Sequence, residues 1–467
     1  DRDFLYLGIR MYDSDPSALI AKQMVHDADM TSDDRINLSF DTFNDRRNAY
    51  FFQINPAGTR SDALIENNRT FRRDWNGIWY AKASVDDEGW SAEFAIPFKT
   101  VSFDAKGGIW GFEAERQIRR KNEVGRWANP SRNRTVVDVA GIGTLTGLGE
   151  VDGTGIDLVP NGSLRYTWDR KRKPEGTDTD TDLLANPGAE VYYKFHPSMT
   201  AALAVNTDFI EAPVDDRRTE LTRFPPFFPE RRDFFLQDAG VFEFGNIKAN
   251  GFPYFSRRVG RLGGEPLDID AGLKLTGRLG RVRWGAMNVQ LPPQRGIDRT
   301  GLSVVRVQRD VLAESAVGII ATHGDPRDLA SNSLVGADFQ YYKSDVRGSN
   351  IVSGNAFDMR SFTSGAEDDE DSFGINAAYP NDRYNASVVF TQIGDDFYPA
   401  LGFLNRRGIR QYDTSFRYRV RPSRILRTVD TGFVTQVVTN RSNDLESTVL
   451  TFNLLELANN PGDKLKF

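Results

Sequence analysis

The sequence predicts an all-β protein with an N-terminal β-sandwich followed by an antiparallel β-barrel of the outer-membrane type. Three observations predict this class. Short apolar runs separated by polar turns fill residues 1–145, as in a sandwich. Strict apolar/polar alternation recurs from about residue 156, and no apolar run approaches the roughly 20 residues of a membrane-spanning helix.

The composition excludes several classes of protein. The 467 residues include 59 Lys and Arg and 65 Asp and Glu, so the net charge is −6, which does not suit a protein that coats nucleic acid. The chain has no cysteine and only three histidines, which excludes disulfides, cysteine nucleophiles and histidine-rich metal centres. The mean hydropathy of −0.48 is typical of a soluble protein, but barrel strands also average as polar because they alternate.

The first part, residues 1–145, is expected to form the sandwich. Its apolar runs are 4–12, 36–43, 49–55, 77–84, 90–96 and 109–118. Polar turns such as 44–47 and 86–89 separate them. Ser14, Asp15 and Pro16 form a helix start signal, so we also expect a helix over Asp15–Met24.

The second part, residues 146–467, follows a glycine-rich joint and is expected to form the barrel. Alternating runs with aromatic residues near their ends occur at 163–168, 189–195, 335–341 and 411–420. Tight turns are predicted at 196–198, 279–281 and 380–382, and long polar loops at 358–371 and 395–408. Short turns at one end and long loops at the other are typical of outer-membrane barrels, and the length suits roughly 14 strands.

Segment 207–267 interrupts the alternation, because Pro225, Pro226 and Pro229 do not fit a central strand. We interpret it as a Phe/Arg/Pro-rich plug-like segment in the barrel lumen, or alternatively as a loop with a local aromatic core. In the plug interpretation the arginines pair with carboxylates of the lumen and the phenylalanines form the plug's own core. The residues concerned are Arg217, Arg218, Arg223, Phe227, Phe228, Arg231, Arg232, Phe234 and Phe235.

Five stretches carry a resemblance to a known bacterial outer-membrane family. Residues 37–58, 74–103 and 110–130 resemble its N-terminal carbohydrate-binding family 9-like domain, while 206–245 and 396–418 resemble the β-barrel region known as DUF5916. The resemblance implies sugar stacking between aromatic residues and a location at the cell outer membrane. We expect the N-terminal domain to lie in the periplasm. Against the family pattern, we expect the sandwich to lack its first strands and the barrel to lack its last ones.

The candidate sugar site lies between residues 67 and 79. Indole faces stack on the CH-rich faces of sugar rings, and nearby amides and carboxylates orient the hydroxyl groups. We expect Trp75 to be exposed for this purpose, whereas Trp79 is a ligand or a core residue. The full set of candidates is Asn67, Arg72, Asp74, Trp75, Asn76 and Trp79.

The acidic residues Asp29, Asp33 and Asp34 are a candidate calcium site, because hard cations prefer clustered oxygen ligands. The alternative is a solvated acidic turn. No other cofactor is predicted, and no catalytic residue is assigned, because the chain lacks the common hydrolase and nucleotide-binding motifs.

Three functions stay open at this point. The first is a non-catalytic barrel that handles glycans or other solutes at the outer membrane. The second is a carbohydrate hydrolase with an appended binding domain, and the third is a scaffold that binds other envelope proteins. The expected partners are outer-membrane lipid, a glycan ligand and envelope proteins, but not nucleic acid.

Overall fold

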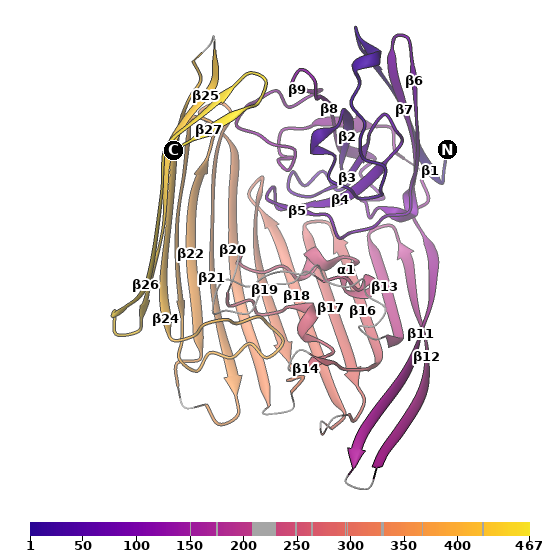
Figure 1. Cartoon of the computed structure of the whole chain (residues 1–467), viewed down its shortest axis with the longest axis vertical. Helices are drawn as coiled ribbons and strands as arrows, with labels where there is room; N and C mark the ends of the chain where they lie inside the picture. The colour runs from indigo at the N-terminus through magenta and orange to yellow at the C-terminus, as the bar shows by residue number, and fades with distance from the viewer. Residues whose placement is uncertain are drawn as a thin grey trace.

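The chain folds almost entirely into antiparallel β-sheets (Figure 1). A computed structural model describes residues 1–149, 151–173, 176–207, 230–247, 250–262, 265–294, 296, 298–327, 331–366, 368–422 and 425–467. The helical elements in these ranges are a single turn of α-helix and short 3₁₀ turns. They are α1 (Asp233–Leu236) and the turns Pro16–Ala18, Met30–Ser32, Phe98–Thr100, Ala239–Phe242 and Ser256–Arg258.

The N-terminal region contains two sheets. The smaller sheet has the order β1 (Phe4–Tyr12), β7 (Gly89–Pro97), β6 (Tyr80–Asp86). The larger sheet has the order β10 (Gly143–Thr146), β8 (Ile109–Ile118), β2 (Arg35–Asp41), β3 (Ala49–Ile54), β4 (Arg60–Glu66), β5 (Thr70–Arg72), and β9 (Glu123–Arg126) pairs with β8.

Both sheets contribute to one aromatic core. Successive side chains of a strand point to opposite faces, so β7 buries Trp90 and Phe94 but exposes Glu93. These rings share a hydrophobic cluster with Phe40 and Phe52 of the other sheet. The predicted helix over residues 15–24 is wrong. Only Pro16–Ala18 forms a 3₁₀ turn, because Asp34 and Asp33 accept hydrogen bonds from backbone N–H groups in the stretch that follows.

The rest of the chain forms one sheet of 15 strands, each antiparallel to the next. In order they are β11 (Gly155–Lys173), β12 (Gly176–His196), β13 (Met199–Thr207), β16 (Ile269–Leu279), β17 (Val282–Leu291), β18 (Thr300–Val311), β19 (Ser315–His323), β20 (Asn332–Val346), β21 (Asn350–Thr363), β22 (Asp371–Pro380), β23 (Tyr384–Ile393), β24 (Ile409–Val420), β25 (Leu426–Asn440), β26 (Leu445–Asn459) and β27 (Lys464–Lys466). The predicted tight turns at 196–198, 279–281 and 380–382 are confirmed. The predicted loop at 358–371 is shorter, because β21 continues to Thr363.

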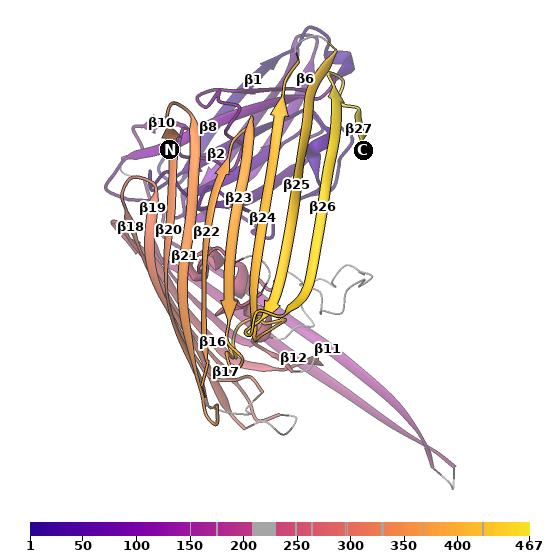
Figure 2. The same ribbon diagram turned by 90° about the vertical axis from the view of Figure 1, so that its left-hand side faces the viewer.

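The sheet order begins at β11 and ends at β27, and no pairing between these two strands occurs in the described ranges. Closure of the sheet into a barrel therefore stays a prediction. Figure 2 shows the N-terminal strands gathered at one end of the large sheet and the β11–β12 hairpin reaching beyond the other strands at the opposite end. No helix in the described part of the chain is long and apolar enough to span a bilayer.

The two faces of the large sheet differ in an unusual way. On β18, Arg306 is 1% exposed while its neighbour Val305 is exposed. On β20, Asp338 is buried while Phe339 is exposed, and the carboxylate of Asp338 forms an ion pair of 2.7 Å with Arg306. Charged groups thus share the inner face with buried apolar residues such as Val304, while apolar side chains cover the outer face. Other exposed apolar residues are Leu273, Val317, Ile319, Val335, Phe362, Phe373, Ile375 and Val388.

The described residues of the connection between β13 and β16 pack against the inner face. Its described residues, 230–247 and 250–262, are here called the inner segment, and with 265 and 266 they include the ribbon β14 (Arg261–Leu262) and β15 (Glu265–Pro266). Phe234 and Phe244 of the inner segment share a hydrophobic cluster with Met287 and Val304 of the wall. Glycines make this close approach possible, since a Cβ on Gly272 would lie 2.9 Å from the ring of Phe234.

Candidate functional site

The N-terminal region sits on the end of the large sheet that carries the turns 197–198, 280–281 and 347–349. The backbone N–H of Phe103 donates to the carbonyl of Pro197 in the β12–β13 turn, at 3.1 Å. The side chain of Asn133 donates to the carbonyl of Ser349 and accepts from the N–H of Asp382, in two further turns. Three turns of the sheet therefore hold this region in place.

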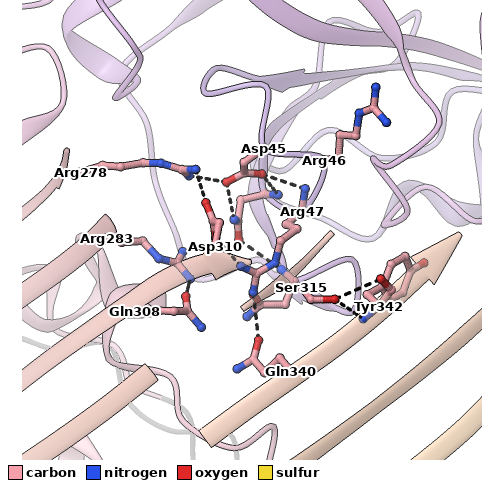
Figure 3. A network of polar contacts seen from close by, with 12 residues as sticks. Asp45, Arg46, Arg47, Arg278, Arg283, Gln308, Asp310, Ser315, Gln340 and Tyr342 are labelled. Atoms are coloured by element: carbon pink, nitrogen blue, oxygen red, sulfur yellow. Dashed lines mark hydrogen bonds and ion pairs between the residues drawn. The ribbon is translucent and has the colours of Figure 1, made fainter. Parts of the chain in front are cut away.

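A network of buried ions joins the N-terminal region to the wall (Figure 3). Arg47, from the turn after β2, is 2.6 Å from one carboxylate oxygen of Asp310 on β18. The other oxygen of Asp310 is 2.5 Å from Arg278 on β16, and Arg278 also pairs with Asp45. Gln340 on β20 accepts a further hydrogen bond of 3.1 Å from Arg47. Asp310 thus bridges two arginines from different parts of the chain.

The local sequence explains how the turn after β2 directs Asp45 and Arg47 toward the wall. The N–H groups of Arg47 and Asn48 donate to the Asp45 carboxylate, at 2.8 and 2.9 Å, and so fix its direction. Asn44 and Arg46 adopt positive φ angles of 50° and 59°, which tightens the chain. Burial raises the pKa of Asp45, but Arg278 and Arg47 outweigh it and hold the pKa at about 2.

A second ion cluster joins the N-terminal region to the inner segment. Arg72 lies 2.9 Å from Glu66 and also pairs with Glu243 of the inner segment. Asn67 donates to the other oxygen of Glu243 at 3.4 Å. Burial, together with the nearby Glu66, raises the pKa of Glu243 to about 7. Two predicted sugar ligands, Asn67 and Arg72, therefore hold the inner segment.

A cavity of about 900 Å³ lies where the N-terminal region, the inner segment and the wall meet. This volume is at the upper end of the range of small-molecule sites. The N-terminal region contributes Arg69 and Asp74, and the inner segment contributes Phe242 and Glu243. The wall supplies hydroxyl and amide side chains, namely Ser353, Asn376, Asn385, Ser387 and Ser415.

The predicted exposure of Trp75 is wrong. Trp75 is 4% exposed and Trp79 is 3% exposed, and both belong to the aromatic core of the N-terminal region. The ring of Trp75 packs on Tyr50, and the indole N–H of Trp79 donates to Asp62 at 2.9 Å. Neither indole has a free face for a sugar. Two of the six candidates, Arg72 and Asp74, line the large cavity, and Asn76 is exposed.

Part of the predicted plug lies outside the described residues, namely Arg217, Arg218, Arg223, Phe227 and Phe228. Among the described ones, Phe234 and Phe235 pack against the wall in a shared cluster, so they do not form a core of their own. Arg232 pairs at 2.8 Å with Glu230 of the same segment and donates to the carbonyls of Ser256 and Val259. This ion pair lies within the segment, so the expected pairing of Arg232 with carboxylates of the wall stays a prediction. Arg231 precedes Arg232 in the chain, two residues before α1 begins.

The predicted calcium ligands serve the backbone. Asp33 accepts from the N–H groups of Lys22 and Gln23, and Asp34 accepts from Ile20. Asp29 accepts from the N–H of Thr31 and caps a 3₁₀ turn. Within the described ranges, no group of three or more His, Asp or Glu side chains comes together that could hold a metal ion. These carboxylates therefore do not form the expected cluster.

Sequence reasoning missed the residues that join the parts, including Arg47, Arg278, Asp310 and Glu243. One signal was available. Arg278 stands between Gly277 and Leu279 in an alternating strand, which places its charge on the inner face. Asp310 stands between Arg309 and Val311 and gives no such signal. Nothing in the sequence indicates that Arg47, more than 200 residues away, reaches the same place.

The sequence matches no protein-family model and no curated protein. Among solved structures, Acinetobacter baumannii OccAB2 is similar to this chain. The alignment has a TM-score of 0.31 and 10% sequence identity, and it covers 91% of this chain and 86% of that chain. The resemblance to the carbohydrate-binding family 9-like domain and the DUF5916 region stays a prediction.

Proposed function

We propose that this chain is an outer-membrane β-barrel protein that handles small polar solutes, glycans among them, and that its N-terminal region covers the periplasmic mouth. The observation that carries the proposal is the placement of side chains on the large sheet. Arg306, Gln308, Asp338 and Gln340 are buried, whereas Ile319 is 59% exposed. A sheet in water would bury the apolar set, while a sheet in lipid presents it outward.

The lengths of the connections support one membrane orientation. Outer-membrane barrels have short turns on the periplasmic side and longer loops outside. The turns that contact the N-terminal region are short, for example 197–198 and 347–349, whereas the connection 394–408 lies at the other end. This pattern supports a periplasmic position for the N-terminal region.

The covered mouth supports a gated role. The ion network around Asp310 and the cluster around Glu243 tie the N-terminal region to the wall and to the inner segment. A solute that passes along the lumen meets these contacts at the short-turn end. Sugar recognition would have to use side chains other than Trp75 and Trp79, because both indoles are buried.

The test combines location with topology. We expect the protein in the outer-membrane fraction, with a faster-migrating folded band on unheated gels that shifts on boiling. Protease should cut the glycine-rich joint at 141–155 only after the outer membrane is permeabilised. A protein recovered entirely in the soluble fraction would contradict the proposal, and cleavage of the joint in intact cells would reverse the orientation.

A further inference from the structure

The large cavity has an unusual charge pattern. Three cationic side chains line it, Arg69, Arg72 and Lys274. Arg72 pairs with Glu66 and Glu243, and the ammonium of Lys274 donates to the backbone carbonyls of Phe234 and Gln237. The structure therefore satisfies two of the three cations from within the protein.

Arg69 differs from the other two. Its side chain is partly buried in the turn between β4 and β5, and within the described ranges no carboxylate lies within ion-pair distance of it. Burial lowers the pKa of its guanidinium, and Arg47 adds to this effect. Removing a charge from water without a partner is costly, so such a group is rarely kept unless something pairs with it.

Four carboxyl groups also line the cavity, and two of them, Glu230 and Glu243, pair with Arg232 and Arg72. The other two are Asp74 and Asp138. Burial raises the pKa of both, which moves each toward the neutral form. Asp138 accepts a hydrogen bond of 3.2 Å from the N–H of Ala140, and Tyr342 interacts with both Asp138 and Arg69. Neither carboxyl neutralises Arg69 in this arrangement.

The opposite side of the cavity is polar but uncharged. Ser353, Asn376, Asn385, Ser387 and Ser415 come from the inner faces of four neighbouring strands. Hydroxyl and amide groups both donate and accept hydrogen bonds, which suits a ligand with several hydroxyl groups. Within the described ranges, the cavity therefore offers one cation without a carboxylate partner, Arg69, and a hydroxyl-binding surface on the other side.

We infer that Arg69 is the anion-binding residue of a solute site in this cavity, and that the ligand is a small hydroxylated carboxylate such as a sugar acid. The inference rests on the proposed function, because it names the class of solute. A guanidinium binds a carboxylate through two parallel N–H···O hydrogen bonds. The serines and asparagines of the wall then hold the hydroxyl groups, and the aromatic rings of Phe242 and Tyr254 exclude water.

The test is calorimetric binding of D-gluconate to the full chain in detergent, with D-glucose and inorganic phosphate as comparison probes. We expect gluconate to bind more tightly than glucose or phosphate. Arg69→Gln should weaken gluconate binding by about 10- to 100-fold, since a charged hydrogen-bond pair is lost. Arg69→Lys keeps the charge but loses the two parallel N–H donors of the guanidinium. Its affinity for gluconate should therefore lie between those of the wild type and Arg69→Gln.

The matched control is Lys82→Gln, which removes one positive charge from an exposed position of β6 in the same N-terminal region. It should leave gluconate binding unchanged. Equal gluconate binding by the wild type and Arg69→Gln would overturn the inference, as would folded wild type that binds no gluconate. Tighter binding of phosphate or glucose would overturn the choice of a carboxylate. Because gluconate binding is measured in detergent, its outcome does not depend on whether the protein is found in the outer-membrane fraction. The failure of this inference and the failure of the proposed function can therefore be told apart.

Discussion

Strands of the N-terminal core and of the large sheet alternate polar and apolar residues in the same way, but β7 buries its apolar residues and β20 buries polar ones. In β7 the apolar residues Trp90 and Phe94 are buried and Glu93 is exposed. In β20 the polar residues Asp338 and Gln340 are buried and Phe339 is exposed. A period of two identifies a strand in both regions, but the surrounding medium decides which face turns outward. The following predictions test this contrast, from the largest expected effect to the smallest.

The first prediction concerns the aromatic core of the N-terminal region. Trp79→Ala should destabilise the N-terminal region by about 3–5 kcal/mol, because it removes a buried indole and leaves Asp62 without that hydrogen bond. The measurement is urea unfolding followed by circular dichroism. The neighbouring exposed residue provides the control, and Tyr80→Ala should change stability by less than about 0.5 kcal/mol. Equal effects would mean that Trp79 is not a core residue.

The second prediction concerns the outer face of the large sheet. Ile319→Lys should cost about 2–4 kcal/mol if Ile319 faces the middle of a bilayer. In water the same exposed substitution would be nearly neutral. The control is Leu312→Lys, at an equally exposed position in the turn between β18 and β19. Unfolding in lipid vesicles measures both, and identical stabilities of the two variants would argue against a lipid-facing sheet.

The third prediction concerns the junction between the two regions. Asp310→Ala removes the bridge between Arg47 and Arg278 and leaves buried guanidinium groups with fewer partners. We expect a loss of about 1–3 kcal/mol and faster proteolysis of the glycine-rich joint at 141–155. Asp345→Ala, which disrupts only an exposed pair with Lys343, should change neither. Unchanged proteolysis of the Asp310 variant would show that the network does not hold the regions together.

The fourth prediction concerns pH. Burial, with Glu66 nearby, raises the pKa of Glu243 to about 7, above an unfolded value of about 4.3. The folded protein then binds a proton more tightly than the unfolded chain, so the contribution of Glu243 to stability is largest at acidic pH and is lost as the pH rises from about 4.3 to about 7. The difference in stability between wild type and Glu243→Gln should therefore vary across this window and stay constant above it. A difference that is constant throughout would contradict the raised pKa.

Much of the strand layout could be predicted from the sequence, because alternation and turn residues are local signals. The run 4–12 coincides with β1 and the run 109–118 with β8. The strands β4 and β5 were not predicted. In β4 the polar residues Ser61 and Asp62 interrupt the apolar run, although both side chains are buried. The candidate site was less predictable, because its residues come together only through contacts between distant segments.

The sequence by itself determined the all-β class, the change from short apolar runs to strict alternation near residue 156, the tight turns and the exclusion of thiol chemistry. Each of these depends on composition or on neighbours a few residues away. Only the tertiary structure decided that Trp75 is buried, that Arg72 holds the inner segment, and that Asp310 bridges Arg47 and Arg278. The physical reason is that burial and ion pairing depend on which surfaces meet in space, and a local pattern is the same whether a strand faces a protein core, a wet lumen or lipid.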